Sequence, residues 1–239
     1  MLSIIIPTFN EERALEGTLK GVKRLQGTLY ELIVADSGST DHTVNIAEKY
    51  ADRVVRYEDQ PKNAARGRNL GVSVAHGEWL AFIDADVTIP HIDEFFTTAV
   101  HAFENDPKLV AIGGRVHTLP ELETWGDRIS HSIINFITYT ANNIFHFGAV
   151  SGEFQMIRAS TFHELKGYNE TLNITEDNDL YARLARVGKV RHLRSLLVLH
   201  PSRRAHAIGW PRLWWHWSVN WVYVIFLGRP WHPEWLHIR

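Results

Sequence analysis

The sequence contains no cysteine, no long apolar run and little net charge, and each absence excludes a class of protein. Without cysteine, the chain can form neither a disulfide nor a thiolate zinc site. No basic region followed by an apolar stretch opens the chain, so we expect no signal peptide. No segment reaches the roughly 18 consecutive apolar residues of a transmembrane helix. The 25 Lys and Arg nearly balance the 27 Asp and Glu, which does not indicate nucleic-acid binding.

The residues that are present are unevenly distributed. The chain has 239 residues, of which 45% are hydrophobic, and this is enough to bury a sizeable core. Seven of the nine Trp lie in the last 30 residues, and five Arg face a single Glu beyond residue 200. An acidic body therefore precedes a basic, Trp-rich tail.

Short apolar runs alternate with helical patterns as far as residue 116. The expected strands are residues 3–7, 31–35, 53–57, 79–83 and 110–116. The expected helices are residues 11–25, 41–50, 64–75 and 92–104. This alternation predicts an α/β fold, with a mostly parallel sheet and helices on both faces. Ligands of such sheets bind beyond the carboxyl ends of the strands, so the polar residues there are the candidates for function.

Two carboxylates follow the strand at residues 79–83. Asp84 and Asp86 are two positions apart, so on an extended chain both side chains would leave the same face. Two such carboxylates repel each other unless a cation lies between them, and hard oxygen ligands favour Mg²⁺ or Mn²⁺. Because Asp is also common in turns, a strand terminator is the alternative interpretation.

A second polar cluster follows the strand at residues 31–35. Asp36 could accept hydrogen bonds from a base or a ribose, and Gly38 allows the backbone to approach a ligand. Ser39 or Thr40 is expected to cap the next helix. The sequence lacks both Gly-x-Gly-x-x-Gly and Gly-x-x-x-x-Gly-Lys-Ser/Thr, which argues against a dinucleotide oxidoreductase and a P-loop NTPase.

Four segments together resemble the nucleotide-binding half of glycosyltransferase family 2, whose members are inverting enzymes of the GT-A fold. They read SIIIPTFNEE from residue 3, ADSGSTD from 35, GRNLGVSVAHG from 67 and WLAFIDAD from 79. The resemblance covers about residues 1–200. It implies a UDP- or GDP-linked sugar donor, with Mg²⁺ or Mn²⁺ at the Asp-x-Asp motif. The donor-site residues that it implies are Pro7, Thr8, Asn10, Glu11, Asp36, Arg66, Asp84, Ala85 and Asp86. For Arg66, a solvated helix position is the alternative.

The acceptor half has its own candidates. A small-residue turn at Gly152 precedes an expected strand at residues 154–157, where backbone could approach a ligand. Thr175 is suited to cap a helix that carries Glu176 and Asp177 in its first turn. The resemblance makes Asp177 the catalytic base beside Glu176, with Arg183 as an acceptor contact. With a phosphate acceptor, which is already ionised, Asp177 would instead orient the acceptor.

A basic group follows the expected strand at residues 195–199. His200 could reach the metal or the diphosphate, and Arg203 and Arg204 could bind phosphate. The alternative is that all three are ordinary solvated residues.

Two segments have an apolar helical face. In residues 211–227 the apolar positions include Leu213, Trp214 and Trp217, continuing to Trp221, Val224 and Ile225. Trp with nearby Arg favours a helix lying in the plane of a membrane interface, whereas core packing or dimerisation is the alternative. Residues 125–137 have Ile at 129, 133 and 137, which indicates either membrane contact or a helix packed on the sheet.

The sequence therefore predicts a glycosyltransferase domain over residues 1–200 and a membrane-interface tail over 201–239. Residues 1–117 form the expected nucleotide-sugar half, and 118–200 the acceptor half. We expect transfer of one sugar to a polyprenyl-phosphate or lipid-linked acceptor, peripherally at the cytoplasmic membrane face. One alternative is a soluble enzyme acting on a polysaccharide or protein, whose tail binds sugar or another subunit. The other is a non-catalytic nucleotide-sugar-binding module.

Overall fold

The computed structural model describes residues 1–58, 63–227 and 231, with only the backbone at 221, 222 and 224–227. The strands are β1 (Leu2–Thr8), β2 (Tyr30–Asp36), β3 (Arg53–Arg56), β4 (Trp79–Ile83), β5 (Leu109–Thr118), β6 (Phe154–Arg158) and β7 (Lys189–His200). The helices are α1 (Leu15–Val22), α2 (Thr43–Ala47), α3 (Ala64–Ser73), α4 (Ile92–Asn105), α5 (Trp125–Asn143), α6 (Ala159–Glu164), α7 (Glu176–Val187), α8 (Arg203–Ile208) and α9 (Trp210–Leu227).

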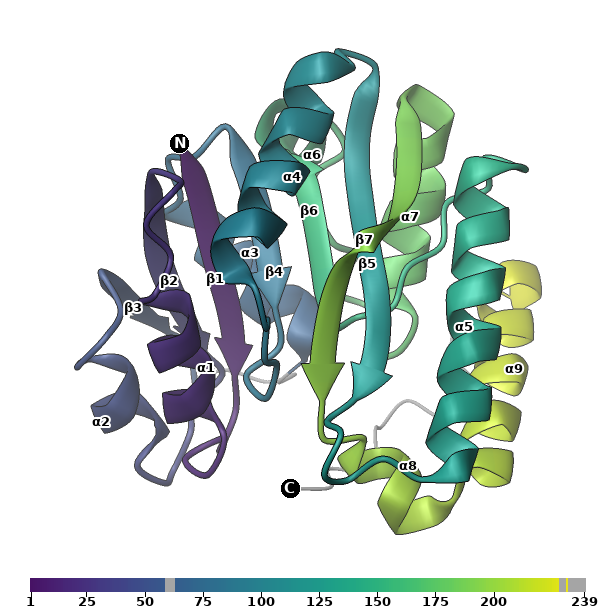
Figure 1. Cartoon of the computed structure of the whole chain (residues 1–239), viewed down its shortest axis with the longest axis horizontal. Coiled ribbons are helices and arrows are strands. Elements are labelled where there is room, and N and C mark those ends of the chain that lie inside the picture. Colours follow the sequence, from purple (N-terminus) through teal and green to yellow (C-terminus); the bar gives the residue numbers. More distant parts are fainter. Residues whose placement is uncertain (59–62, 228–230, 232–239) are drawn as a thin grey trace.

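The strands form a seven-stranded sheet in the order β3-β2-β1-β4-β6-β5-β7 (Figure 1). Strand β6 runs antiparallel to both of its neighbours, β4 and β5. The other pairs are parallel, as expected for strands joined through helices. The predicted mostly parallel α/β sheet is confirmed, and the reversed β6 is the feature that the alternation did not reveal.

Helices cover both faces of the sheet, and each face has its own apolar core. One core joins side chains of α1, α2 and α4 to alternate sheet residues such as Ile4 and Ile6. The other joins α3, α6 and α7 to the intervening residues, among them Ile5 and Ile33. Helix α3 lies very close to the sheet, because a side chain at Gly71 would clash with Ile5. Burial on both faces explains why the strands are continuously apolar rather than alternating.

Several element boundaries differ from the expectation. Residues 11–14 form hydrogen-bonded turns, so α1 begins only at Leu15. Helix α2 is only five residues long, whereas β7 begins at Lys189, six residues before the expected strand. Turn hydrogen bonds replace helix at residues 11–14 and 48–50, and pairing with β5 extends β7. The expected division at residue 200 coincides with the end of β7.

Helix α5 buries its polar side, which is the reverse of an ordinary surface helix. Its buried residues are polar, namely Asp127, Ser130, His131, Thr138 and Asn142. Two asparagines bind the backbone of the strands beneath. Asn135 exchanges hydrogen bonds of 2.9 and 3.0 Å with Val116 of β5. Asn143 exchanges bonds of 2.9 and 3.1 Å with His192 of β7.

The apolar side of α5 faces outward. Trp125 is 78% exposed and Phe136 66% exposed, and Ile129, Ile133 and Ile137 are exposed as well. The predicted helix is therefore present, but packing of its apolar face on the sheet, which was one of the two interpretations, is wrong.

The tail forms α8 and α9, and α9 packs along α5 (Figure 1). The expected helix over residues 211–227 is confirmed, and Leu213 of its apolar face is buried. Trp214 donates a hydrogen bond to Ser130 of α5, whereas Trp215 is 64% exposed. The side chains of Trp221, Val224 and Ile225, like residue Trp235, lie outside the described residues. Over the described residues, no helix is both long and apolar enough to cross a bilayer.

Asp127 fastens the tail to the body. This buried carboxylate caps α5 through Thr124, and it accepts hydrogen bonds from His206 of α8 (2.9 Å) and Trp210 of α9 (2.8 Å). Burial alone would raise the pKa of Asp127, but the bonds from His206, Thr124 and Trp210 lower it to about 2.

We expect Asp127→Asn to lower the free energy of unfolding by about 2 kcal/mol at neutral pH, because charged hydrogen bonds are lost. Since the pKa is depressed in the folded state, this stabilisation exists above the ordinary Asp pKa and disappears as the pH falls towards 2. Urea unfolding across this pH range measures it. Exposed Glu121→Gln is the matched control, with an expected change within about 0.5 kcal/mol. A constant difference between the wild type and Asp127→Asn at every pH would contradict the assignment.

Candidate active site

The loops after β1 and β2 are bound to each other at the carboxyl edge of the sheet. Asn10 has a left-handed backbone with φ 52°, and its backbone N–H donates to Ser39 (2.7 Å). Its side-chain oxygen accepts from the Thr40 N–H (2.8 Å), and the Glu11 N–H donates to Thr43 (2.7 Å). The predicted donor-site residues Asn10 and Glu11 therefore lie beside the loop that Asp36 opens.

Asp36 shapes that loop from beneath. The residue is fully buried, and its carboxylate accepts hydrogen bonds from the N–H groups of Gly38 (3.0 Å) and Ser39 (2.8 Å). It also accepts from the hydroxyls of Ser39 and Thr8. The expected capping by Ser39 or Thr40 is wrong, because Ser39 binds Asp36 and α2 begins only at Thr43.

Pro7 and Thr8 end β1 at the same edge. Thr8 is buried, whereas Pro7 is partly exposed. A side chain at Gly67 of α3 would lie 3.6 Å from Pro7 and 3.3 Å from Ser37, so glycine allows α3 to approach the two loops closely. The beginning of α3 therefore belongs to the same region as the strand ends.

The two aspartates after β4 lie in a turn rather than on an extended chain. The Val87 N–H donates to the Asp84 carbonyl (3.2 Å), and Thr18 of α1 donates to the carbonyl of buried Ala85 (2.8 Å). Each carboxylate meets a different arginine. Arg68 of α3 lies 3.2 Å from Asp84, and Arg203 of α8 lies 2.7 Å from Asp86. The predicted location at a strand end is correct, but the predicted extended geometry is wrong.

Arg68 is a site residue that the sequence did not indicate. Its side chain is only 4% exposed, and it joins Asp84 to Glu176 of α7, 2.8 Å away. It also lies over the ring of Tyr168, at 5.4 Å from the centroid. Arg66, the predicted residue, instead lies over Tyr57 at 4.7 Å. The two arginines are two positions apart on α3. Which of them points into the site therefore depends on how α3 is rotated about its own axis.

Glu176 and Asp177 begin α7 as predicted, next to the turn that contains Gly152. A side chain at Gly152 would lie 3.2 Å from the Asp177 carboxylate, so glycine keeps this approach open. Burial, followed by the neighbouring Glu176, raises the pKa of Asp177 to about 7. A carboxylate with such a pKa can accept a proton near neutral pH. Thr175 stands at the cap position, but its φ is 64° and its hydroxyl makes no capping bond, so that expectation is wrong.

Two further predicted contact residues, Arg183 and Arg203, have different partners in the structure. Arg183 binds the carbonyls of Leu165 (2.9 Å) and Gly167 (2.8 Å) and pairs with Asp179, so it holds a loop, and its acceptor contact stays a prediction. Arg203 does lie in the site, where it also pairs with Glu11 at 2.9 Å.

Arg204 lies near the carboxylates of Asp84, Glu153 and Asp86. Burial lowers its pKa, and these carboxylates oppose that effect. Both tail arginines therefore contribute positive charge to the carboxyl edge, as a phosphate contact requires.

His200 belongs to a polar cluster beneath α5. Its Nε2 lies 3.3 Å from Nε2 of His131, 3.3 Å from the Ser202 hydroxyl and 3.8 Å from Glu153. Burial and the neighbouring His200 lower the pKa of His131 to about 4. Among the described residues, no three His, Asp or Glu side chains are arranged to hold a metal ion. The predicted set of Asp84, Asp86 and His200 is therefore not assembled in this structure.

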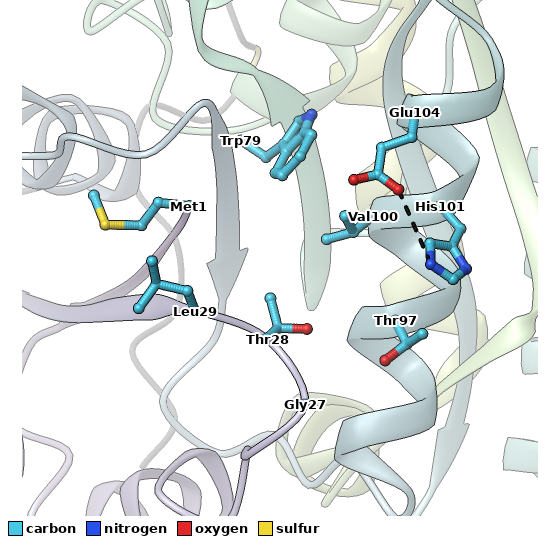
Figure 2. Close-up of a pocket in the computed structure, with 9 residues that line it drawn as sticks. All are labelled: Met1, Gly27, Thr28, Leu29, Trp79, Thr97, Val100, His101 and Glu104. Carbon is cyan, nitrogen blue, oxygen red and sulfur yellow. Dashed lines mark ion pairs between the residues drawn. The ribbon is translucent and has the colours of Figure 1, made fainter.

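The hollow in Figure 2 lies at the other end of the sheet. Its volume is about 260 Å³, and its lining includes Met1, Leu29 and Trp79, which precede or begin β1, β2 and β4. None of the predicted site residues lines it. The charged groups at the carboxyl edge, rather than this hollow, are the candidate active site.

Comparison with known proteins agrees with the geometry. Residues 3–166 match the profile of glycosyl transferase family 2. The chain belongs to this family. A PGL/p-HBAD biosynthesis glycosyltransferase of Mycobacterium bovis is 33% identical over 117 residues, which are 47% of this chain and 46% of that protein. The chain thus spans about half the length of the curated relatives it matches.

Solved structures show that this chain has the GT-A fold. Mannosyltransferase PcManGT from Pyrobaculum calidifontis, in complex with GDP-Man and Mn²⁺, matches 86% of this chain and 59% of its own. The TM-score is 0.68 and the identity 19%. Glucosyl-3-phosphoglycerate synthase from Mycobacterium tuberculosis, with Mn²⁺, UDP and glucosyl-3-phosphoglycerate, matches 96% of this chain and 81% of its own. Here the TM-score is 0.63 and the identity 18%.

We expect Arg68→Met to lower the free energy of unfolding by about 3 kcal/mol, because Glu176 and Asp84 lose their shared buried cation. Urea unfolding at neutral pH measures this change. Exposed Arg186→Met on α7 is the control, with an expected change within about 0.5 kcal/mol. Equal unfolding free energies for the two variants would contradict the role of Arg68.

Proposed function

We propose that this chain is an inverting, metal-dependent glycosyltransferase that moves one sugar from a nucleotide-diphosphate sugar to an acceptor. The observation that carries the proposal is the convergence of Asp84, Asp86 and Asp177 at the carboxyl edge, with Arg68 between the two halves. Neighbouring structures that contain Mn²⁺ with GDP-Man or UDP support the donor class.

Asp84 and Asp86 would hold the divalent cation. Both offer the hard oxygen ligands that Mg²⁺ and Mn²⁺ prefer, and donor phosphates and water would complete the coordination. When bound, the cation would stabilise the negative charge of the leaving diphosphate. In this structure Arg203 neutralises Asp86, so donor binding would require a rearrangement in which Arg203 exchanges that carboxylate for phosphate.

Asp177 would act as the base. Its pKa near 7 allows it to take the proton from an acceptor hydroxyl while that oxygen attacks the anomeric carbon. The bond from the anomeric carbon to the phosphate oxygen breaks on the opposite face and releases the nucleoside diphosphate, so the configuration is inverted. Arg68 binds Glu176, the residue that precedes Asp177, and thereby positions the start of α7.

The acceptor in this proposal is a polyprenyl phosphate or a lipid-linked sugar at the cytoplasmic face of a membrane. Support comes from the tail, which is basic and Trp-rich and leads directly out of the site, since α8 begins at Arg203. An acceptor held at a membrane beside the tail would therefore be close to the candidate base.

We expect Asp177→Asn to lower the rate of sugar transfer or donor hydrolysis by about 10²–10⁴-fold, as for loss of a positioned base. Because the base must be deprotonated, the wild-type rate should rise with pH through about 7, and this limb should be absent from the variant. Hydrolysis of UDP-glucose and GDP-mannose with Mn²⁺ measures both effects. Exposed Asp93→Asn is the control. Near-wild-type turnover by Asp177→Asn would exclude the base, and no hydrolysis by the wild type would favour a binding module.

Nucleotide binding is tested separately by thermal unfolding. We expect UDP or GDP with Mn²⁺ to raise the melting temperature by about 5–10 °C at roughly hundredfold ligand excess, because the ligand binds only the native state. Asp86→Asn should remove the Mn²⁺-dependent part of this shift. Exposed Glu104→Gln, at the opposite end of the sheet, should retain it. A shift of equal size with and without Mn²⁺ would contradict the proposed metal site.

A further inference from the structure

We propose that the outward side of α5 is a docking surface for an anionic lipid bilayer. The α5 face consists of Trp125, Ile129, Ile133, Phe136 and Ile137, which lie within one broad stripe of the helix. All five are between 44% and 78% exposed. Beyond the helix, Phe145 and Phe147 stack at 5.6 Å and are also exposed. The apolar surface thus continues past the end of α5.

The reversed polarity of α5 argues that this exposure is a property of the fold. An amphipathic helix on a soluble protein normally turns its apolar stripe inward. Here the inward side is specified by hydrogen bonds from Asn135 and Asn143 to the strands beneath. Rotating the helix to bury the Ile and Phe side chains would break these bonds. Large exposed apolar patches mark interaction sites, because leaving them in water costs about 25 cal/mol per Å².

The charges around the face favour a lipid surface over a second copy of this chain. Residues 128–152 contain no Asp or Glu, Asp127 is buried, and Glu123 just before α5 is paired with Arg128 at 2.6 Å. Exposed Arg194 of β7 lies 3.9 Å from the ring centroid of Tyr139 on α5, and exposed Arg212 lies in the first turn of α9. A two-fold contact would place this patch against itself, and residues 128–152 would offer the arginines no carboxylate. Anionic headgroups provide the missing negative charge.

The aromatic residues also fit an interface between water and lipid. Trp125 opens α5, and Phe145 and Phe147 follow its end, so aromatic rings flank the aliphatic side chains. Trp is favoured at the level of the headgroups, and apolar helix faces bind in the plane of the bilayer.

Docking through α5 would also hold the candidate active site near the headgroups. Helix α5 begins next to α8, which starts in the site at Arg203 (Figure 1). This inference rests on the membrane-face part of the proposed function, and it assigns bilayer contact to α5 rather than to the tail. Trp210 and Trp214 of the tail bind α5 instead, so they serve to hold the two helices together.

Vesicle sedimentation tests the docking surface. The double variant Ile129→Ser with Phe136→Ser removes two exposed apolar side chains. Leu29→Ser is the matched control, since Leu29 is 74% exposed at the opposite end of the sheet. Trp215→Ser tests the tail. The probes are vesicles of phosphatidylcholine with phosphatidylglycerol, and vesicles of phosphatidylcholine alone.

We expect the wild type to sediment with the anionic vesicles, more weakly as salt rises, and less with the neutral ones. The double variant should lose at least about tenfold in affinity, whereas Leu29→Ser should not change it. Wild-type protein that stays in the supernatant, or a double variant that binds normally, would overturn the proposal. So would loss of binding by Trp215→Ser alone, or a lipid-free dimer that the double variant dissociates.

Thermal unfolding and donor hydrolysis distinguish a failure of the docking surface from a failure of the proposed function. Thermal unfolding of each variant shows that it is folded, because the substituted residues are exposed and should not affect stability. Donor hydrolysis in solution should be the same in all variants. Normal hydrolysis without vesicle binding would overturn only the docking surface. Vesicle binding without hydrolysis by the wild type would overturn the catalytic proposal and leave the surface intact.

Discussion

The candidate site depends on the ion pairs of the buried Arg68 guanidinium. A cation removed from water requires negative partners, and Arg68 finds them in both halves of the domain, Asp84 after β4 and Glu176 at the start of α7. It therefore fixes the distance between the Asp-x-Asp turn and the helix that carries Asp177. The same low exposure that strengthens these ion pairs raises the pKa of Asp177 towards neutrality.

A second set of ion pairs gives the uneven charge of the chain a structural meaning. The basic tail and the acidic body meet directly, since Arg203 pairs with Asp86 and Glu11, and His206 binds Asp127. Part of the basic character of the tail, namely Arg203, thus neutralises carboxylates of the site. The exposed apolar surface that remains lies on the outward side of α5, where a negatively charged lipid surface would complement the arginines around it.

The order of strands and helices, and the location of Asp84, Asp86, Glu176 and Asp177, could be predicted, because apolar periodicity and strand-end carboxylates are local signals. Individual partners could not. Arg183 binds the backbone carbonyls of a loop, and His200 packs with His131. Such pairings join residues that are far apart in the chain, so sequence position does not reveal them.

Helix α5 shows which features the sequence determines and which are decided only by the tertiary structure. The sequence by itself determined an amphipathic helix with isoleucine at every fourth position from 129 to 137, because that spacing places the side chains on one side of a 3.6-residue turn. Which side faces the sheet was decided only by the tertiary structure. Asn135 and Asn143 meet backbone groups of Val116 and His192 at the sheet beneath α5, and buried backbone polar groups must be satisfied. That requirement turns the apolar side towards solvent.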